Sequence, residues 1–383
     1  MKVLLIGEYS RLHNSLKEGL IKNGHKVLLI GSGDGFKGYP IDINIGSKMK
    51  ESPFPFFLMK VVYRLFRIDL SKIEIAFKLY VLLPSLKKYD IVQLINEDIL
   101  KTNLRFQKWF IKKLVTQNKK LFLLSCGTDY VSVKYAFDKK IRYSILSPLH
   151  KNPKLKKKYR YILKYISKQN LEHHMLLYQN ITGVFASDID YHIPLKGHPK
   201  YLGLIPNPIN IEKLKFSPLL ITGNKINIFH GINSENTFKK GNLFFEDALK
   251  IIQIKYSEKI NVITTKDVPY KDYITLYNDS HIILDQVYAF DQGYNALEAM
   301  AKGKVVFTGA EKEWLDYYNL EEDTIAINAL PDVDKIVEKL EWLILNPQKI
   351  IEISKNARAF IEKEHDYIQT ANKYASYWAN KAK

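Results

Sequence analysis

Residues 281–309 combine carboxylates, amides and a glycine in a spacing that suits an anionic sugar ligand. The apolar run at 282–284 predicts a buried strand. The loop after it holds five polar or flexible residues: Asp285, Gln286, Asp291, Gln292 and Gly293. A helix is expected to begin near Tyr294, and its first-turn amides, including that of Asn295, would point at an anion. Glu298 lies about one turn further and could accept hydrogen bonds from sugar hydroxyls, so the stretch predicts a ligand with phosphate and sugar, such as a nucleotide diphosphate.

Two parallel strands and the helix between them must position these groups. The helix is expected to stop at Gly303, and a second buried strand is predicted at 305–307. In open α/β sheets, ligands bind beyond the carboxyl ends of the strands, where this loop and this helix start would lie. An ordinary strand–helix–strand unit with a surface glutamate is the alternative interpretation.

The string at 293–306, Gly-x-x-x-Leu-Glu-Ala-Met-Ala-x-Gly-x-Val-Val, resembles the nucleotide-sugar motif of family 4 retaining glycosyltransferases, which have the GT-B fold. In that family, two glutamates separated by seven residues flank the helix start. The second holds the ribose and matches Glu298, whereas Phe290 stands in place of the first, which helps to position the transferred sugar. The contacts with that sugar would then fall to other residues: Asp285, Gln286 or Asp291.

A second segment resembles the part of the same family that holds the diphosphate of the donor. A strand predicted at 226–229 ends at His230 and Gly231, and Lys240 precedes the next helix. The family uses an arginine and a lysine here; Lys240 matches the lysine, no arginine stands at the other position, and Lys239 could compensate. A cation would stabilise the negative charge of a leaving diphosphate, so Lys240 is a catalytic candidate. A surface lysine pair before a helix is the alternative.

The loop after the first predicted strand, at 3–6, resembles the loop that faces acceptor and diphosphate in many GT-B enzymes. This loop contains a glycine, a serine and a histidine: Gly7, Ser10 and His13. These three residues are therefore candidates for the acceptor side. A helix is expected to follow from about Asn14.

A turn at 125–130 gives a further acceptor-side candidate. It follows a strand predicted at 120–124 and resembles a histidine-glycine-x-aspartate turn that lies near the anomeric carbon in related enzymes. Gly127 and Asp129 match that pattern, while Cys126 stands where histidine is common. Asp129 is the second catalytic candidate, and capping the next helix is its alternative role.

The length of 383 residues suggests about two domains. The segment 204–210, with two prolines and an asparagine, resembles the linker between GT-B domains. The expected fold is α/β, with two Rossmann-like domains facing across a cleft. The expected division is an acceptor-binding domain at 1–205, a nucleotide-sugar domain at 206–365 and a helix at 366–383 that crosses back. The Val268-Pro269-Tyr270 loop and the helix expected after it resemble the segment beside the base.

The formal net charge of +18 predicts polyanionic partners, which include phosphorylated substrates, anionic membranes and nucleic acid. Residues 151–168 contain eight lysines or arginines and no acid. We expect this run to contact a membrane or an anionic substrate, with RNA binding or a solvated face as alternatives. Residues 52–68 mix aromatics with cations and predict either a membrane-surface helix or a core helix whose cations reach solvent. The single cysteine, Cys126, allows no internal disulfide and fits a reducing cytoplasm.

These observations predict an enzyme that moves a sugar from a nucleotide-diphosphate sugar to a glycan or lipid-linked acceptor in surface polysaccharide synthesis. Retention at the anomeric carbon follows from the resemblance alone. The nucleotide sugar is a substrate, so no cofactor is expected. The expected location is the cytoplasm, peripheral on the anionic inner face of the cell membrane, and no nucleic acid partner is expected.

No metal site is expected either. Asp188-Ile189-Asp190 has the letters of a metal-binding triplet but precedes the linker, and His173 and His174 are adjacent and would point apart on a helix. Two other functions fit part of the pattern: a sugar-nucleotide epimerase of GT-B architecture, and a basic nucleic-acid-binding protein that uses 151–168.

Overall fold

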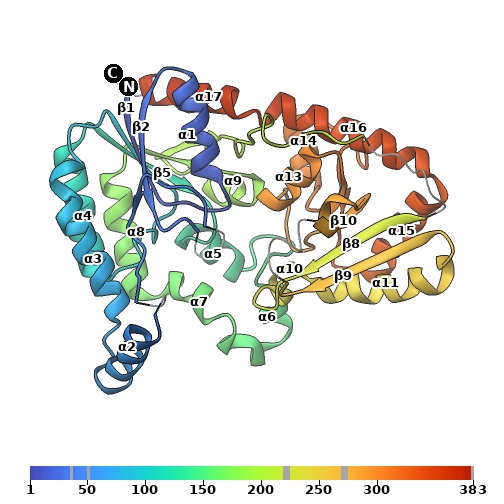
Figure 1. Cartoon of the computed structure of the whole chain (residues 1–383), viewed down its shortest axis with the longest axis horizontal. Coiled ribbons are helices and arrows are strands. Elements are labelled where there is room, and N and C mark those ends of the chain that lie inside the picture. Colours follow the sequence, from blue (N-terminus) through green and yellow to red (C-terminus); the bar gives the residue numbers. More distant parts are fainter. Residues whose placement is uncertain (35–37, 50–51, 219–224, 269–274, 381–383) are drawn as a thin grey trace.

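The structure is a computed structural model that describes residues 1–383 apart from 35–37, 50–51, 219–224, 269–274 and 381–383. The described chain forms two parallel β-sheets set side by side, each with helices on both faces (Figure 1). The central strands are runs of Val, Ile and Leu buried on both sides, as expected where helices cover a parallel sheet. The expected α/β fold with two Rossmann-like units is therefore confirmed.

The first sheet has seven strands in the order β3-β2-β1-β4-β5-β6-β7. Their bounds are β1 Lys2–Ile6, β2 Lys26–Gly31, β3 Ile43–Asn44, β4 Ile91–Leu94, β5 Lys120–Ser125, β6 Gly183–Ala186 and β7 Tyr201–Leu204. At the centre, Val3 of β1 pairs with Val27 of β2 on one side and with Ile91 of β4 on the other. The strand order changes direction between β1 and β4, and ligands of such sheets bind beyond the carboxyl ends at this point.

The helices of the first half fill the connections between these strands. They are α1 Leu12–Lys22, α2 Pro53–Phe66, α3 Leu70–Leu82, α4 Leu104–Gln117, α5 Tyr130–Phe137, α6 Ser147–Lys151, α7 Arg160–Leu163, α8 Lys168–Asn180 and α9 Ile189–Leu195. The core-helix interpretation of 52–68 is wrong, because no residue of α2 is buried. Its apolar side chains are exposed or at most half-buried.

The basic run at 151–168 is not one continuous helix. It is broken into α7 and two 3-10 turns, at Pro153–Lys157 and Lys164–Ile166. Two of its apolar residues nevertheless face inward, because Tyr159 and Ile162 are buried in a small core with residues of α5 and α6. The lysines of the run are therefore turned outward.

The second sheet has five strands in the order β12-β11-β10-β8-β9. Their bounds are β8 Ile226–Ile232, β9 Ile260–Lys266, β10 Ile282–Leu284, β11 Val305–Thr308 and β12 Ile327–Asn328. The helices are α10 Thr237–Lys240, α11 Asn242–Tyr256, α13 Tyr294–Ala301, α14 Lys312–Tyr318, α15 Val333–Leu345, α16 Pro347–Glu364 and α17 Tyr367–Asn380. Pro269, Tyr270 and the start of the helix expected after them lie outside the described residues.

Helix α17 leaves the second half and packs on α1 beside the first sheet (Figure 1). The fit is close: a side chain on Gly19 of α1 would place its Cβ 2.2 Å from the carbonyl oxygen of Tyr367. Asn23 Nδ2 donates a hydrogen bond to the Ile368 carbonyl at 3.2 Å, and the rings of Trp378 and Phe122 lie 6.3 Å apart. The last helix thus completes the core of the first half.

Candidate functional site

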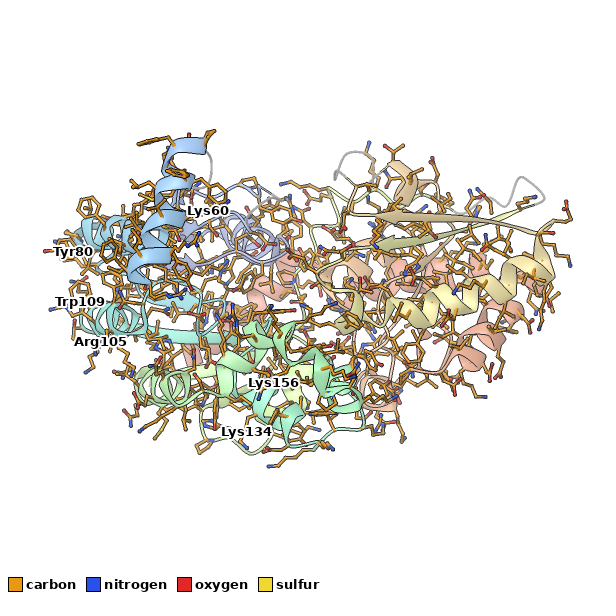
Figure 2. The ribbon with its side chains drawn as sticks, turned by 90° about the horizontal axis from the view of Figure 1, so that it is seen from below. Lys60, Tyr80, Arg105, Trp109, Lys134 and Lys156 are labelled. Atoms are coloured by element: carbon orange, nitrogen blue, oxygen red, sulfur yellow. The ribbon has the colours of Figure 1, made fainter. Side chains whose placement is uncertain are left out.

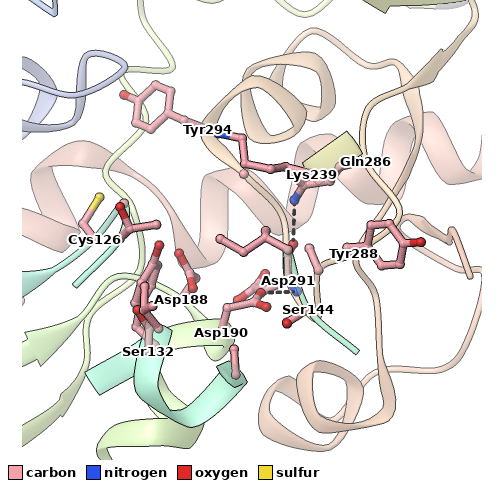
Figure 3. Close-up of a pocket in the computed structure, with 18 of the residues that line it drawn as sticks. Cys126, Ser132, Ser144, Asp188, Asp190, Lys239, Gln286, Tyr288, Asp291 and Tyr294 are labelled. Carbon is pink, nitrogen blue, oxygen red and sulfur yellow. Dashed lines mark hydrogen bonds between the residues drawn. The ribbon is translucent and has the colours of Figure 1, made fainter. Parts of the chain in front are cut away.

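A cavity of about 560 Å³ lies between the two halves, within the size range of small-ligand sites (Figure 3). Its walls come from loops that follow strands of both sheets. Tyr9 and Ser10 follow β1, Cys126 follows β5, and Gln286 and Gly293 belong to the loop after β10. The carboxyl ends of the two sheets therefore face the same space.

The predicted β10–α13–β11 unit forms part of the cavity wall on the side of the second half. Ile282 pairs with Val305 in parallel register, and α13 begins at Tyr294, after the N-cap residue Gly293, which offers no side chain to cap the helix. Tyr294 also lines the cavity; its hydroxyl donates to the Pro208 carbonyl and accepts from Ser15 Oγ, both at 2.8 Å. The helix start is thus fixed against the linker and against α1.

Lys239, rather than Lys240, is the cation in the described cavity wall. Burial and the neighbouring Lys240 lower the pKa of Lys239 to about 8. Its ammonium lies 4.8 Å from the centre of the Tyr161 ring, which belongs to the basic run of the first half. Lys239 can therefore change charge near neutral pH while facing a ligand.

Lys240 lies behind that wall and is held by an ion pair. Its Nζ is 2.7 Å from Oδ1 of Asp285, a buried carboxylate that also accepts a hydrogen bond from Asn295 Nδ2 at 3.0 Å. The Lys240 carbonyl accepts from the Val287 amide at 2.8 Å, which ties the lysine to the loop after β10. These contacts shape the site, and direct contact of Lys240, Asp285 or Asn295 with a ligand stays a prediction.

Three carboxylates meet across the boundary between the halves: Asp188, Asp190 and Asp291 (Figure 3). Asp190 accepts hydrogen bonds from the amides of Phe290 and Asp291, at 3.0 and 3.1 Å for Oδ2. Asp291 in return accepts from the Ile189 amide at 3.0 Å. Burial and mutual repulsion raise the pKa of all three carboxyl groups. Residues 188–190 were not predicted as site residues because they precede the linker, although their position soon after β6 is typical of residues that line a site.

The second half of the chain is similar to a known family. Residues 225–376 match the glycosyl transferase-like family. This match covers the second half of the chain and indicates a glycosyltransferase. No curated protein matches it significantly.

Solved structures share the fold of the chain over nearly its whole length. HepE of Anabaena, in complex with UDP and glucose, has a TM-score of 0.59 at 15% identity, covering 99% of this chain and 100% of that one. Sucrose-phosphate synthase of Thermosynechococcus elongatus has a TM-score of 0.59 at 12% identity, with 99% of both chains covered. UDP-GlcNAc 2-epimerase of Neisseria meningitidis, bound to UDP-GlcNAc, has a TM-score of 0.55 at 14% identity, covering 99% and 100%. At these identities the likeness is one of fold.

The remaining donor-side candidates are set back from the described cavity wall. His230 is fully buried at the end of β8, where its Nε2 accepts from Asn242 Nδ2 at 2.8 Å. Burial lowers the pKa of His230 to about 4, so the ring is neutral and positions α11. Gly231 is half-buried in the same strand, and Glu298 is half-buried on α13 near Tyr294 and Lys302. Ligand contact by these three residues stays a prediction.

Phe290, at the position of the missing family glutamate, is buried. The guanidinium of Arg142 lies 4.7 Å from the centre of its ring, and Tyr143 packs at 5.1 Å. Arg142 and Tyr143 in turn bond Glu311 of the second half. An aromatic contact between the halves thus occupies the place of a sugar-binding carboxylate.

On the acceptor side, the structure brings only one of the four predicted residues into the described cavity wall. Ser10 lines it, and its amide donates to Asp34 Oδ2 at 2.9 Å. Gly7 is buried with φ +96°, a conformation that favours glycine, and its carbonyl bonds His13 Nδ1 at 2.8 Å. His13 is fully buried, and burial lowers its pKa to about 3. Gly7 and His13 therefore shape the loop that presents Ser10.

Asp129 has the capping role that the sequence left as its alternative. Its Oδ1 accepts from the amide and the hydroxyl of Ser132, at 2.8 and 2.6 Å, at the first turn of α5. The second carboxylate oxygen accepts from Ser125 Oγ. Asp129 is buried and absent from the described lining, while its neighbours Cys126 and Ser132 line the cavity.

Two further residues, missed as positioning groups, hold this turn. Asn96 Nδ2 donates to the carbonyls of Cys126 and Thr128, at 2.7 and 3.0 Å. Glu97 accepts from the first amide of α5 and bonds His174 Nδ1 at 2.9 Å. His174 is thereby used in a hydrogen bond, and no group of three metal-ligating side chains occurs among the described residues.

Proposed function

We propose that the chain transfers a sugar from a nucleotide-diphosphate sugar to a glycan or lipid-linked acceptor in surface polysaccharide synthesis. The observation that carries the proposal is the shared cavity, whose wall contains the start of α13 on one side and the loops after β1 and β5 on the other. A donor bound to the second half would thus face an acceptor bound to the first. The solved structures of HepE with UDP and glucose, and with UDP-glucose, support a donor of this class.

The diphosphate would lie against the first turn of α13 at Gly293 and Tyr294. The helix dipole favours an anion there, and the Lys239 ammonium adds a positive charge. Lys240 would support this site through its ion pair with Asp285. Gln286 and Asp291 line the cavity next to this position and would face the transferred sugar, while Glu298 would hold the ribose.

The proposed reaction needs no strong protein nucleophile. The acceptor hydroxyl forms a bond to the anomeric carbon as the bond from that carbon to the phosphate oxygen breaks. The phosphate oxygen takes the acceptor proton, and attack on the same face gives retention. Helix amides and lysine ammonium groups stabilise the charge on the leaving nucleoside diphosphate, so the scheme uses no metal ion.

Product analysis tests the proposal. Candidate nucleoside diphosphates are first screened for thermal stabilisation, since a ligand at about 100 times its Kd adds about 2.7 kcal/mol to stability. The nucleotide sugar that matches the best ligand is then incubated with and without acceptor glycans. Transfer predicts nucleoside diphosphate release that depends on the acceptor. An epimerised nucleotide sugar formed without acceptor would instead favour the epimerase alternative.

We also propose that the enzyme works in the cytoplasm, at the inner face of the cell membrane. Among the described helices, none is both long enough and apolar enough to span a membrane. Any membrane association of the described part would then rest on its surface. Salt-dependent binding to RNA or DNA, with no response to nucleotide sugars, would favour the nucleic-acid alternative.

A further inference from the structure

Helix α2 is the most exposed apolar element in the described chain. None of its fourteen residues is buried. Five large apolar side chains are more than half exposed: Phe54, Phe57, Tyr63, Leu65 and Phe66. Soluble monomers seldom expose a contiguous apolar surface of this kind without a partner.

The exposed surface continues onto α3 and reaches α4. Four side chains of α3 are more than half exposed: Ile73, Phe77, Tyr80 and Val81. The Tyr80 ring stacks on Trp109 of α4, with 6.0 Å between ring centres. We refer to these exposed apolar residues of α2 and α3 as the α2–α3 ridge. Because the ridge includes many large apolar side chains on two adjacent helices, it differs from the single exposed apolar residues that are common on protein surfaces.

The ridge is also positively charged. Lys60, Arg64 and Arg67 are exposed on or directly after α2, which contains no acid. The nearest acids on α3 are already used, because Asp69 caps the helix and Glu74 pairs with Lys78. A second copy of this chain, with the same charge of +18, would be repelled from such a surface. An anionic partner fits it.

The ridge shares one side of the molecule with the basic run. In Figure 1, α2 and the segment around α6 and α7 both lie at the lower edge. Figure 2 views this side, with Lys60, Tyr80 and Trp109 near one end and Lys156 nearer the middle. The basic run also contributes Tyr165 to the cavity wall. This side therefore carries apolar groups, cations and one wall of the site.

We propose that the α2–α3 ridge docks on an anionic lipid bilayer, with α2 lying in the interface between headgroups and acyl chains. At about 1.5 Å per residue, α2 is about 21 Å long, too short for a hydrocarbon core of about 30 Å. Aromatic residues on one helix with cations between them are typical of interfacial helices. Docking itself does not need the transfer reaction; its use in reaching a lipid-linked acceptor rests on the proposed function.

Vesicle co-sedimentation tests the ridge directly. The full chain should bind phosphatidylcholine vesicles that contain phosphatidylglycerol much more tightly than vesicles without it, and added salt should weaken the binding. Phe57→Ser with Phe66→Ser should lower partitioning at least about tenfold, because two exposed apolar anchors are lost. Ile254→Ser with Leu345→Ser, which alters exposed apolar residues on helices of the second half, is the matched control and should leave binding unchanged.

Variants that remove cations measure the electrostatic contribution to vesicle binding separately from the apolar contribution. Lys60→Ala with Arg64→Ala should lower partitioning on anionic vesicles about 30-fold, at about one tenfold step per 1.4 kcal/mol and about 1 kcal/mol per cation. Lys250→Ala, an exposed lysine on α11, should have little effect. In a Trp342→Phe background, Trp109 fluorescence should be quenched by brominated lipids. This substitution removes the half-buried Trp342 of α15, and the other two tryptophans, Trp314 and Trp378, are buried.

Binding that survives both sets of ridge variants would overturn the proposal. The proposal would also be overturned if sedimentation velocity showed a dimer that the Phe57→Ser and Phe66→Ser changes dissociate, because the ridge would then be an interface between two copies of the chain. Thermal stabilisation by nucleoside diphosphates is measured on every variant. A ridge variant that loses vesicles but keeps this stabilisation supports docking separately from the donor site.

Discussion

The Asp190 carboxylate accepts a hydrogen bond from the backbone amide of Asp291 at 3.1 Å, across the boundary between the two sheets. The aspartate follows β6 of the first half, and the amide belongs to the loop after β10 of the second half. The two halves therefore meet through carboxyl groups directly beside the cavity.

Asp188→Asn should change how stability depends on pH. Burial raises the pKa of Asp188 above its ordinary value of 3.8. The folded chain then keeps a proton that the unfolded chain releases, so the contribution of this group to stability falls as pH rises above that value. Asparagine cannot ionise, and we expect the variant to gain stability relative to the parent from pH 5 to pH 7.5, by at most about 1.4 kcal/mol per pH unit. Urea unfolding at several pH values measures this; Asp316→Asn, an exposed aspartate on α14, should show no such trend.

Lys239→Ala should weaken donor binding without loss of fold stability. The side chain faces the cavity and has a pKa of about 8, so its charge is lost as pH rises through that value. Nucleoside diphosphate affinity should therefore fall between about pH 7 and pH 9 in the parent, and this pH dependence should vanish in the variant. Calorimetric titration at several pH values gives the result. An unchanged pH profile would place the diphosphate elsewhere.

Lys240→Ala should behave differently, because it removes the partner of a buried carboxylate. Asp285 would be left without its cation, which should cost about 1–3 kcal/mol of unfolding free energy. The matched control, Lys250→Ala, breaks an exposed pair with Asp247 and should cost less than about 1 kcal/mol. Addition of Asp285→Asn to the first variant should restore part of the loss, as thermal unfolding would show. A loss no larger than that of the control would contradict this role.

Glu298→Ala should reduce affinity for a ribonucleotide by about 10- to 140-fold, because a hydrogen bond to a charged group contributes about 1.5–3 kcal/mol. The test compares ribose with deoxyribose nucleoside diphosphates. If Glu298 holds the ribose, the parent discriminates between these ligands and the variant does not. Equal discrimination by both proteins would remove Glu298 from the ribose site.

Gly19→Ala should loosen α17 from α1. Its Cβ would lie 2.2 Å from the Tyr367 carbonyl oxygen, and that atom belongs to the backbone of a packed helix. Overpacking of this kind costs about 1–3 kcal/mol. Ile21→Ala, at an exposed position of the same helix, is the control for mutation of α1. Limited proteolysis should release residues near α17 faster in the glycine variant only.

The sequence was most informative where local pattern decides structure. The strand at 282–284, the helix start after Gly293 and the stop at Gly303 could be predicted because apolar runs and glycines specify them locally. The sequence did not predict which of the two lysines, Lys239 or Lys240, faces the cavity. Adjacent residues on a helix point about 100° apart, and the direction of each side chain depends on how the short helix α10 is oriented. The meeting of Asp190 with Phe290 also escaped prediction, because it depends on how two separately folded sheets are placed. Phe290 itself was recognised only as a missing glutamate, although its ring packs against Arg142.

The packing of α17 on α1 has a consequence for the folding of the chain during its synthesis. Residues 367–380 leave the ribosome only after the whole second sheet has been made, yet they cover α1, near the start of the polypeptide. Until then the face of α1 that packs against α17 is uncovered in the new chain. Folding on the ribosome should therefore favour factors that shield nascent chains, and truncation before α17 should leave material that aggregates.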